Sequence, residues 1–515
     1  MASNKQEEKT IPLRYWVDER QNTVVIAEAK GDFVDALFSL LTLPLGTIIR
    51  LGNKFEQPVE IGCINNLYQS VQDLLSLNDF WNKMCKEMLL SPRNPLEASC
   101  QRLKVNVDDT QPTKYFMCHS CSKSSNLWVS TFDGARCYCG KLMRKEMELL
   151  VEEPKEDADG GNSVFVKGDA MFLIHDDLRV LRSSPSDSVP PFVKHRHKDL
   201  SKMTEKSQNV GMKEIFSILK QALTSETPLS DVFVPNRESK SSYSFSPDSG
   251  PIHWEGSVEI KVIVSKSENK VKFVEADGNF VDFLVSFLTT PLGSILNLMN
   301  GKLSLGSIDN LYTSVKKLNP SWFKGSSNKS LLNPRVAPQF GCKSNPLNAL
   351  QEEDTPKYWY GTVEDNKGSI RSERKMISKV KNLLRDPADT KLFEPRCFDG
   401  AREPAVGFMK RPCLFIVKDD LQVIPITTTS SITHLQQLEN VQLDDLEEHW
   451  VEIRKAHEAL NLLRASLTSK ATFTQCLSYK LKKWNCQRCI PFWGWKDKGY
   501  EKKKRKKKEK GQGGN

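Results

Sequence analysis

The chain has 515 residues, of which 38% are hydrophobic and 27% are charged, as in a globular protein with more than average loop. Its net charge is +10, but ten Lys/Arg and only three Asp/Glu lie in residues 496–515, so +7 of that charge belongs to this tail. The rest is nearly neutral, which argues against a fold with a basic nucleic-acid-binding face, and the tail indicates an anionic partner.

The first ten residues contain no apolar run, so we expect no secretory signal. Thirteen cysteines without such a signal indicate a reducing compartment, where clustered cysteines more often bind metal than form disulfides. The longest uncharged stretch, residues 283–301, is interrupted by Pro291 and Gly293, so no transmembrane span is expected. We expect an intracellular protein of the nucleus or cytoplasm, with peripheral membrane attachment as a further option.

The first predicted element is a β-hairpin, because the apolar runs 13–17 and 23–29 flank a polar turn. A buried helix follows over residues 33–43, with Asp32 as its N-cap and Asp35 three residues later, as in a capping box. Residues 171–181 predict strand, turn and strand, and residues 212–233 predict a helix that runs into a turn. The polar inserts 152–163 and 183–208 predict unstructured chain.

Much of this pattern then recurs. Residues 28–46 match residues 275–293 at 13 of 19 positions, an offset of 247, and later matches keep offsets between 242 and 244. The segments around Tyr115 and Tyr358 are one such pair. The sequence therefore predicts two copies of one unit, each long enough to bury a core of its own.

The predicted fold class is α+β, with two tandem units of short β-hairpins and packed helices. The expected boundaries are a disordered N-terminus (1–12), a first unit (13–234) with an inserted zinc-ribbon-like segment (115–142), a Ser/Pro-rich linker (235–256), a second unit (257–477) without the cysteine cluster, and a basic tail (478–515).

Four cysteines in the first unit form the strongest chemical motif, C-x2-C-x15-C-x-C: Cys118, Cys121, Cys137 and Cys139. Two close pairs of thiolates suit a tetrahedral zinc ion held by two turns, and residues 127–132 between them predict a strand, as in a zinc ribbon. His119 could replace one thiolate. Because protein would fill all four positions, we expect about one structural zinc ion per chain and no catalytic metal.

Together these motifs resemble a plant family catalogued as domain of unknown function 674. The shared features are FVDxLxSxLTxPLG, NLYxSV, LLxPR, the cysteine cluster and DDLxV, and the resemblance covers nearly the whole chain. It implies a plant source and a tandem arrangement, and it carries over no catalytic residue.

The tail combines a lone CxxC pair, Cys486 and Cys489, with clustered tryptophans and an unbroken basic run: Lys502, Lys503, Lys504, Arg505, Lys506, Lys507 and Lys508. Four interpretations stay open: a nuclear-import or nucleic-acid patch, a membrane-surface anchor helped by acylated cysteines, half of a second metal site, and a solvated tail.

No phosphate-binding loop or nucleophile-elbow motif occurs, and no catalytic residue is assigned. The string that begins at His457 and Glu458 has Asn461 where a second zinc-binding histidine would stand, so we interpret His457 as an exposed helical residue. The carboxylate pairs Asp176–Asp177 and Asp419–Asp420 are interpreted as turn residues.

The sequence thus favours a non-enzymatic binding or scaffold protein with an unknown protein partner. One alternative is an enzyme of unknown reaction in the cleft between the units, and a pocket lined by ionisable side chains at their interface would favour it. The other is a nucleic-acid-binding protein that uses the zinc ribbon and the lysine-rich tail.

Overall fold

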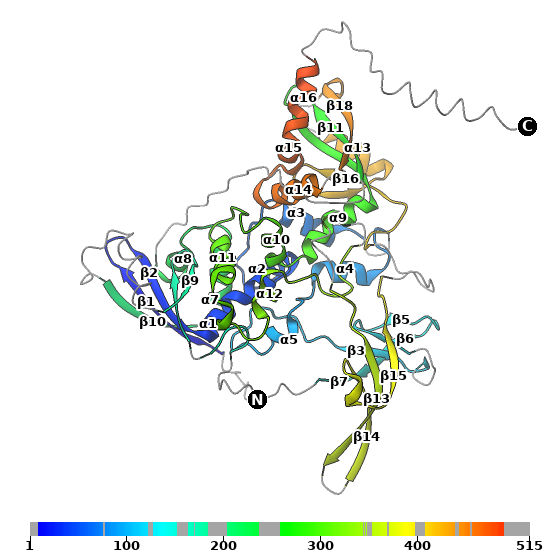
Figure 1. The fold of residues 1–515 in the computed structure, drawn as a ribbon. Helices are drawn as coiled ribbons and strands as arrows, with labels where there is room; N and C mark the ends of the chain where they lie inside the picture. The colour runs from blue at the N-terminus through cyan, green and yellow to red at the C-terminus, as the bar shows by residue number, and fades with distance from the viewer. Residues whose placement is uncertain are drawn as a thin grey trace, which may run out of the picture.

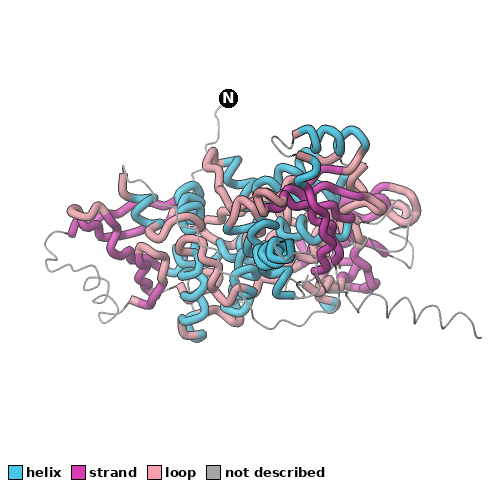
Figure 2. The backbone as a smooth tube through the Cα atoms, turned by 90° about the horizontal axis from the view of Figure 1, so that it is seen from above, coloured by secondary structure: helices cyan, strands magenta, loops and turns pink. Residues whose placement is uncertain are grey.

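The computed structural model describes residues 9–488, except 76–77, 122–126, 152–162, 169, 184–202, 236–257, 343–344, 346, 348–352, 368–369, 397–406, 438–441 and 454–455. Three β-sheets surround a central group of helices (Figures 1 and 2). The fold is therefore mixed α and β, as predicted. We call residues 9–235 the first half and residues 258–488 the second half. The predicted linker, residues 235–256, and the charged part of the tail fall almost wholly outside the described residues.

The first sheet belongs to the first half and has the antiparallel order β10-β1-β2-β8-β9. It contains the predicted hairpin, β1 (Ile11–Asp18) and β2 (Thr23–Lys30), and the predicted strand pair, β8 (Met171–His175) and β9 (Val180–Arg182). Alternate β1 side chains are buried, which explains why the period-two pattern was informative.

The fifth strand corrects one prediction. Residues 203–208 were expected to be unstructured, but β10 (Met203–Val210) pairs along its whole length with β1. Five consecutive side chains of this edge strand are exposed. Backbone hydrogen bonds therefore define the strand, and its side chains carry no apolar alternation from which it could be predicted.

The second sheet belongs to the second half and repeats this order as β17-β16-β12-β11-β18. Both sheets even have the same register shift, between Trp16 and Val17 in one and between Ile263 and Val264 in the other. Its strands are β11 (Val258–Ser265), β12 (Lys270–Asp277), β16 (Leu414–Lys418), β17 (Val423–Pro425) and β18 (Leu446–Ile453).

Most helices of both halves lie between these two sheets (Figure 1). The first half supplies α1 (Gly31–Ser39), η1 (Leu40–Thr42), α2 (Leu45–Lys54), α3 (Ile64–Asp73), α4 (Lys83–Leu90), α5 (Glu97–Cys100), α7 (Met212–Ala222) and α8 (Pro228–Phe233). The second half supplies α9 (Gly278–Thr289), α10 (Leu292–Leu298), α11 (Ile308–Lys317), η4 (Pro320–Trp322), α12 (Ser327–Leu332), α13 (Thr428–Gln436), α14 (Ala456–Thr468), α15 (Thr472–Cys476) and α16 (Ser478–Arg488). Of these, α13 packs on the opposite face of the second sheet and α16 lies at its far end (Figure 1).

The two halves cross at Pro44 and Pro291, which face each other in an antiparallel bridge. The Leu45 N–H donates to the Thr290 carbonyl over 3.1 Å, and the Leu292 N–H donates to the Leu43 carbonyl over 3.0 Å. Each proline lies between the end of one buried helix and the start of the next, so both halves make the same kind of turn at this point.

Beyond this crossing, each half covers the sheet of the other. In α3, the Ser70 hydroxyl accepts from the Val423 N–H of β17, and in α11 the Ser314 hydroxyl accepts from the Val180 N–H of β9, both over 2.9 Å. The largest buried hydrophobic cluster runs from Ile11 to Leu481. The expectation that each half buries its own core is therefore wrong, since the halves share one.

The predicted capping box of α1 is also wrong. Asp32 does not cap the helix, and the buried Asp35 carboxylate instead accepts the backbone N–H groups of Val164, Phe165 and Val166. Asp282 occupies the same place in α9, where it accepts from two backbone N–H groups and Arg411. Spacing alone could not reveal these distant partners. Burial raises the pKa of both carboxyl groups from 3.8 to about 6.

These raised pKa values predict that the free energy of unfolding falls as pH rises from 4 to 7. The folded chain keeps Asp35 protonated up to about pH 6, whereas the unfolded chain loses that proton near its ordinary pKa of 3.8. The difference corresponds to about 3 kcal/mol. Urea unfolding at several pH values should show a shallower pH dependence for Asp35→Asn than for the wild type; equal slopes would contradict the expectation.

A second prediction concerns the crossing. A methyl group at Gly293 would lie 2.7 Å from the Leu331 carbonyl oxygen and 3.0 Å from that of Leu41, so backbone would have to shift. Gly293→Ala should lower the free energy of unfolding by about 1–3 kcal/mol, measured by urea denaturation. Gly278→Ala is the control, because its new methyl would meet no atom closer than 3.3 Å.

Candidate metal centre

The four predicted metal-binding cysteines lie at two turns of the third sheet. Cys118 ends β3 (Tyr115–Cys118), and Cys121 follows in the next turn. Cys137 and Cys139 lie between β5 (Ala135–Arg136) and β6 (Leu142–Met147). The strand predicted over 127–132 is β4 (Leu127–Ser130). These strands have the order β5-β6-β3-β4.

The turns bring all four sulfur atoms within 4.8 Å of one another. The Cys118 and Cys139 sulfurs are 3.5 Å apart, and those of Cys121 and Cys137 are 3.8 Å apart. A tetrahedral ion with metal–sulfur bonds of 2.3 Å separates its ligands by about 3.8 Å, so the group has the size of a four-thiolate site. Among the described residues no other group of three or more His, Cys, Asp or Glu side chains comes together this way, and His119 is not part of it.

The second turn holds its two cysteines in a tight backbone loop. The Cys137 N–H donates to the Lys141 carbonyl and the Gly140 N–H donates to the Cys137 carbonyl, each over 2.8 Å. Gly140 has φ +84°, a conformation that side chains with a Cβ rarely adopt. A hydrogen bond from the Lys141 backbone lowers the pKa of Cys139 to about 7, whereas burial raises the pKa of Cys137. Of the two cysteines in this turn, only Cys139 is thus shifted toward the thiolate that a metal ion requires.

Aromatic rings pack around the turn that carries Cys137 and Cys139. The Tyr138 ring packs edge-on against Trp128 at 4.8 Å and against Phe393 at 5.2 Å between centroids. Phe393 belongs to the second half, and its N–H donates to the Val129 carbonyl over 2.7 Å. The zinc-ribbon-like segment 115–142, called the ribbon below, thus contacts the second half as well as the first.

The ribbon continues into strands of the second half, in the order β4-β15-β13-β14-β7, in which β13 is Tyr358–Lys367. β15 (Arg385–Leu392) runs parallel to β4, and β14 (Ile370–Ser378) runs parallel to β7 (Leu149–Leu150). Only Glu148 separates β6 from β7, and its carbonyl accepts from the Ile377 N–H of β14 over 3.1 Å. Because β6 pairs with β3 and β7 pairs with β14, this one segment joins both ends of the strand order into a small barrel. The rings of Tyr115 and Tyr358, which the duplication pairs, meet inside it at 5.5 Å.

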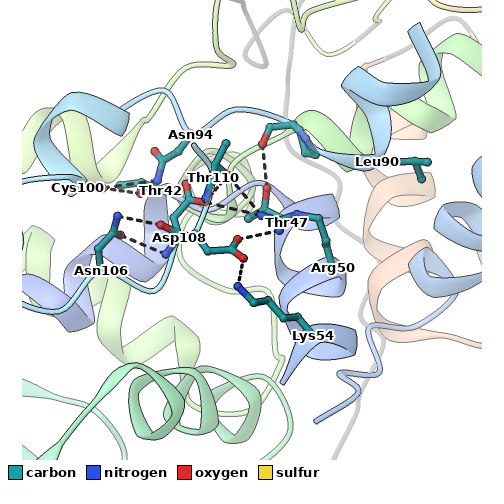
Figure 3. Close-up of polar contacts among 12 residues, drawn as sticks. Thr42, Thr47, Arg50, Lys54, Leu90, Asn94, Cys100, Asn106, Asp108 and Thr110 are labelled. Carbon is teal, nitrogen blue, oxygen red and sulfur yellow. Dashed lines mark hydrogen bonds and ion pairs between the residues drawn. The ribbon is translucent and has the colours of Figure 1, made fainter. Parts of the chain in front are cut away.

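A polar network holds the segment that leads into the ribbon (Figure 3). Asp109 forms ion pairs with Arg50, at 2.8 Å, and with Lys54, both on α2. Burial opposes its ionisation, but the hydrogen bonds from Lys54 and Arg50 lower the pKa of Asp109 below its ordinary value. The N–H of Thr113, two residues before the start of β3, donates to Glu97 over 2.6 Å. Sequence reasoning missed this network, because its charges are spread over sixty residues without a motif.

The remaining cysteines of the second half and of the tail are only partly described. Cys342 and Cys413 are half-buried and lie outside the four-cysteine group, and Cys397 lies outside the described residues. The backbone of Cys486 belongs to α16, but its side chain, together with Cys489 and the basic run 502–508, lies outside the described part of the chain.

The two carboxylate pairs occupy turns, as predicted. Asp176 is buried and accepts from the N–H and hydroxyl of Ser230, and Asp419 accepts in the same way from Thr474. A cavity of about 300 Å³ adjoins the first pair, between the β8–β9 turn and α11. Its ionisable lining side chains are His175, Asp176, Asp177, Arg179 and Glu226.

Two further predictions concern His457 and membrane-spanning helices. His457 is half-buried in α14, not exposed as expected, and it takes no part in the metal group. In the part of the chain that the structure describes, no helix is long and apolar enough to cross a lipid bilayer.

The chain belongs to the family described as "Protein of unknown function (DUF674)", whose profile matches residues 7–456. This confirms the family inferred from the motifs. Comparison with curated proteins and with solved structures gave no match.

The geometry predicts that Cys118→Ser removes a bound metal ion. The purified wild-type chain should contain about one ion, and the variant should contain close to none and melt about 5 °C lower, because a buried corner of the ribbon loses its link. Elemental analysis and thermal unfolding measure both effects. Cys413→Ser changes a half-buried cysteine outside the group and should alter neither; a metal-free wild-type chain would contradict the site.

Proposed function

We propose that the four cysteines hold a structural zinc ion in a non-enzymatic binding or scaffold protein. The observation that carries this proposal is the set of four sulfur atoms within 4.8 Å, two from each turn. Four cysteine ligands complete a tetrahedral zinc shell and leave no position for water or substrate. Zinc is favoured over other ions because it takes all-thiolate tetrahedral sites without redox chemistry.

The ribbon's surroundings explain what such an ion would stabilise. β3 and β4 have only four residues each, and only a small hydrophobic cluster, which includes Cys137 and Tyr138, holds the turn with Cys137 and Cys139. Short strands bury little surface, so a metal cross-link would add the stability that this corner of the barrel lacks.

We also propose that the chain consists of two tandem units, 13–234 and 257–477, that pack reciprocally. The equal strand orders, the equal register shifts and the paired contacts of Ser70 and Ser314 support this division. The barrel, to which each unit contributes strands, would then be a rigid platform. The tail 478–515 would direct localisation or binding to nucleic acid or an anionic membrane surface.

One observation favours the alternative of an enzyme between the halves. The cavity beside Asp176 and Asp177 lies at their interface and carries ionisable side chains. Its carboxylates, however, already serve the fold, because Asp176 binds Ser230 and Asp177 binds the Arg179 guanidinium over 2.9 Å. We therefore retain the scaffold as the proposed function.

Cobalt substitution distinguishes a closed structural site from an open catalytic one. The chain loaded with Co²⁺ should give the intense visible absorption of a four-coordinate thiolate site, and added azide should leave the spectrum unchanged because no position is open. Cys118→Ser, which should no longer hold the ion, is the matched control and should not give this absorption. A wild-type spectrum that shifts with azide would overturn the structural assignment.

A further inference from the structure

A second cavity lies in the second half, outside the metal centre. It has a volume of about 320 Å³ and is enclosed by α14, α15, the start of α16 and the inner faces of β11 and β18. We call it the α14 pocket. Its apolar part is formed by five buried side chains: Ile260, Ile453, Leu462, Phe473 and Leu477.

The first half shows why this pocket exists. The β1–β10 pair Ile11–Val210 corresponds to the β11–β18 pair Val258–Ile453, so the two inner faces can be compared position by position. In the first half the ring of Tyr15, on β1, stacks at 5.3 Å on the ring of Phe233, at the end of α8.

The second half has smaller side chains at both of these positions. Val262 corresponds to Tyr15 and Leu477 corresponds to Phe233, at the offsets of 247 and 244 that the duplication gives. Trp484 of α16 stacks on His449 at 3.9 Å and covers one end of the face. Of the two smaller side chains, Leu477 lines the α14 pocket, so the pocket adjoins the place where the first half has the larger Phe233.

The charges at the mouth of the pocket are paired. Glu458 and Lys480 approach to 3.5 Å, so they neutralise each other and offer no net charge to a ligand. Tyr479 beside them is largely exposed. Within the pocket, burial raises the pKa of Cys476 to about 12, so this thiol is uncharged as well.

We propose that the α14 pocket binds an uncharged apolar molecule of about the size of two fused rings, with one hydroxyl or amide at the Glu458–Lys480 mouth. An engineered cavity of about 150 Å³ binds benzene, and the α14 pocket has about twice that volume. Mainly apolar pockets with a few polar groups at one end are typical sites for small molecules. The paired mouth offers both a donor and an acceptor, which suits a neutral head group.

The probe for this site is 2-naphthol, which has two fused rings and one hydroxyl. Calorimetric titration of the full chain should show one equivalent bound. Leu477→Phe introduces the side chain that stands at the corresponding position of the first half, and it should weaken binding at least tenfold by filling the pocket. Leu443→Phe makes the same change at an exposed site and should bind as the wild type does.

Three outcomes would overturn the proposal: no binding by the wild type, equal binding by Leu477→Phe, or binding only after residues 489–515 are removed, which would assign the pocket to the chain's own tail. If Leu477→Phe fails to fold, methyl NMR of the wild type decides instead. Added 2-naphthol should then shift the resonances of Ile260 and Ile453, which line the pocket, and unshifted resonances would refute the site.

Discussion

The reciprocal backbone pair at Pro44 and Pro291 is the constraint on which the rest of the architecture depends. Two hydrogen bonds, Leu45 to Thr290 and Leu292 to Leu43, fix the ends of two buried helices side by side. Because a proline follows each helix, the chain must turn there, and α2 and α10 leave toward the opposite half. From that crossing, α3 reaches the second sheet and α11 reaches the first. The shared core is a consequence of this exchange.

The barrel is one sheet built from strands of both halves, although these strands differ in sequence and in length between the halves. In the first half, β3 and β4 are short, and four cysteines gather where they end. In the second half, β13 (Tyr358–Lys367) and β14 have ten and nine residues and pair at nine positions. A long hairpin gains more backbone pairing and cross-strand contact than a short one. The second half thus has a long hairpin at the place where the first half has short strands and the thiol cluster.

The sequence predicted those parts of the molecule whose determinants lie close together in the chain. The hairpin over residues 11–30 and the following helix have strong periodic patterns, and the four cysteines have a recognised spacing. The parts it missed depend on distant partners. Asp35 binds backbone 129 to 131 residues away, β10 is defined by pairing with β1, and the barrel closes through parallel contacts between halves. Such contacts leave no local signal, because the side chains involved are polar, exposed or ordinary β residues.

Differences between corresponding positions are therefore more informative about function than the similarities. Positions that maintain the crossing and the shared core are alike in both halves, as Asp35 and Asp282 or Ser70 and Ser314 show. Where the halves differ, one has a feature that the other lacks. Among the described residues the thiol cluster occurs only in the first-half ribbon, and the α14 pocket is lined by Leu477 at the position where the first half has Phe233. Because the shared core already stabilises both sheets, either half can lose a ring pair or a ligand set at a local cost. A stable paired fold thus leaves each half free to acquire a site of its own.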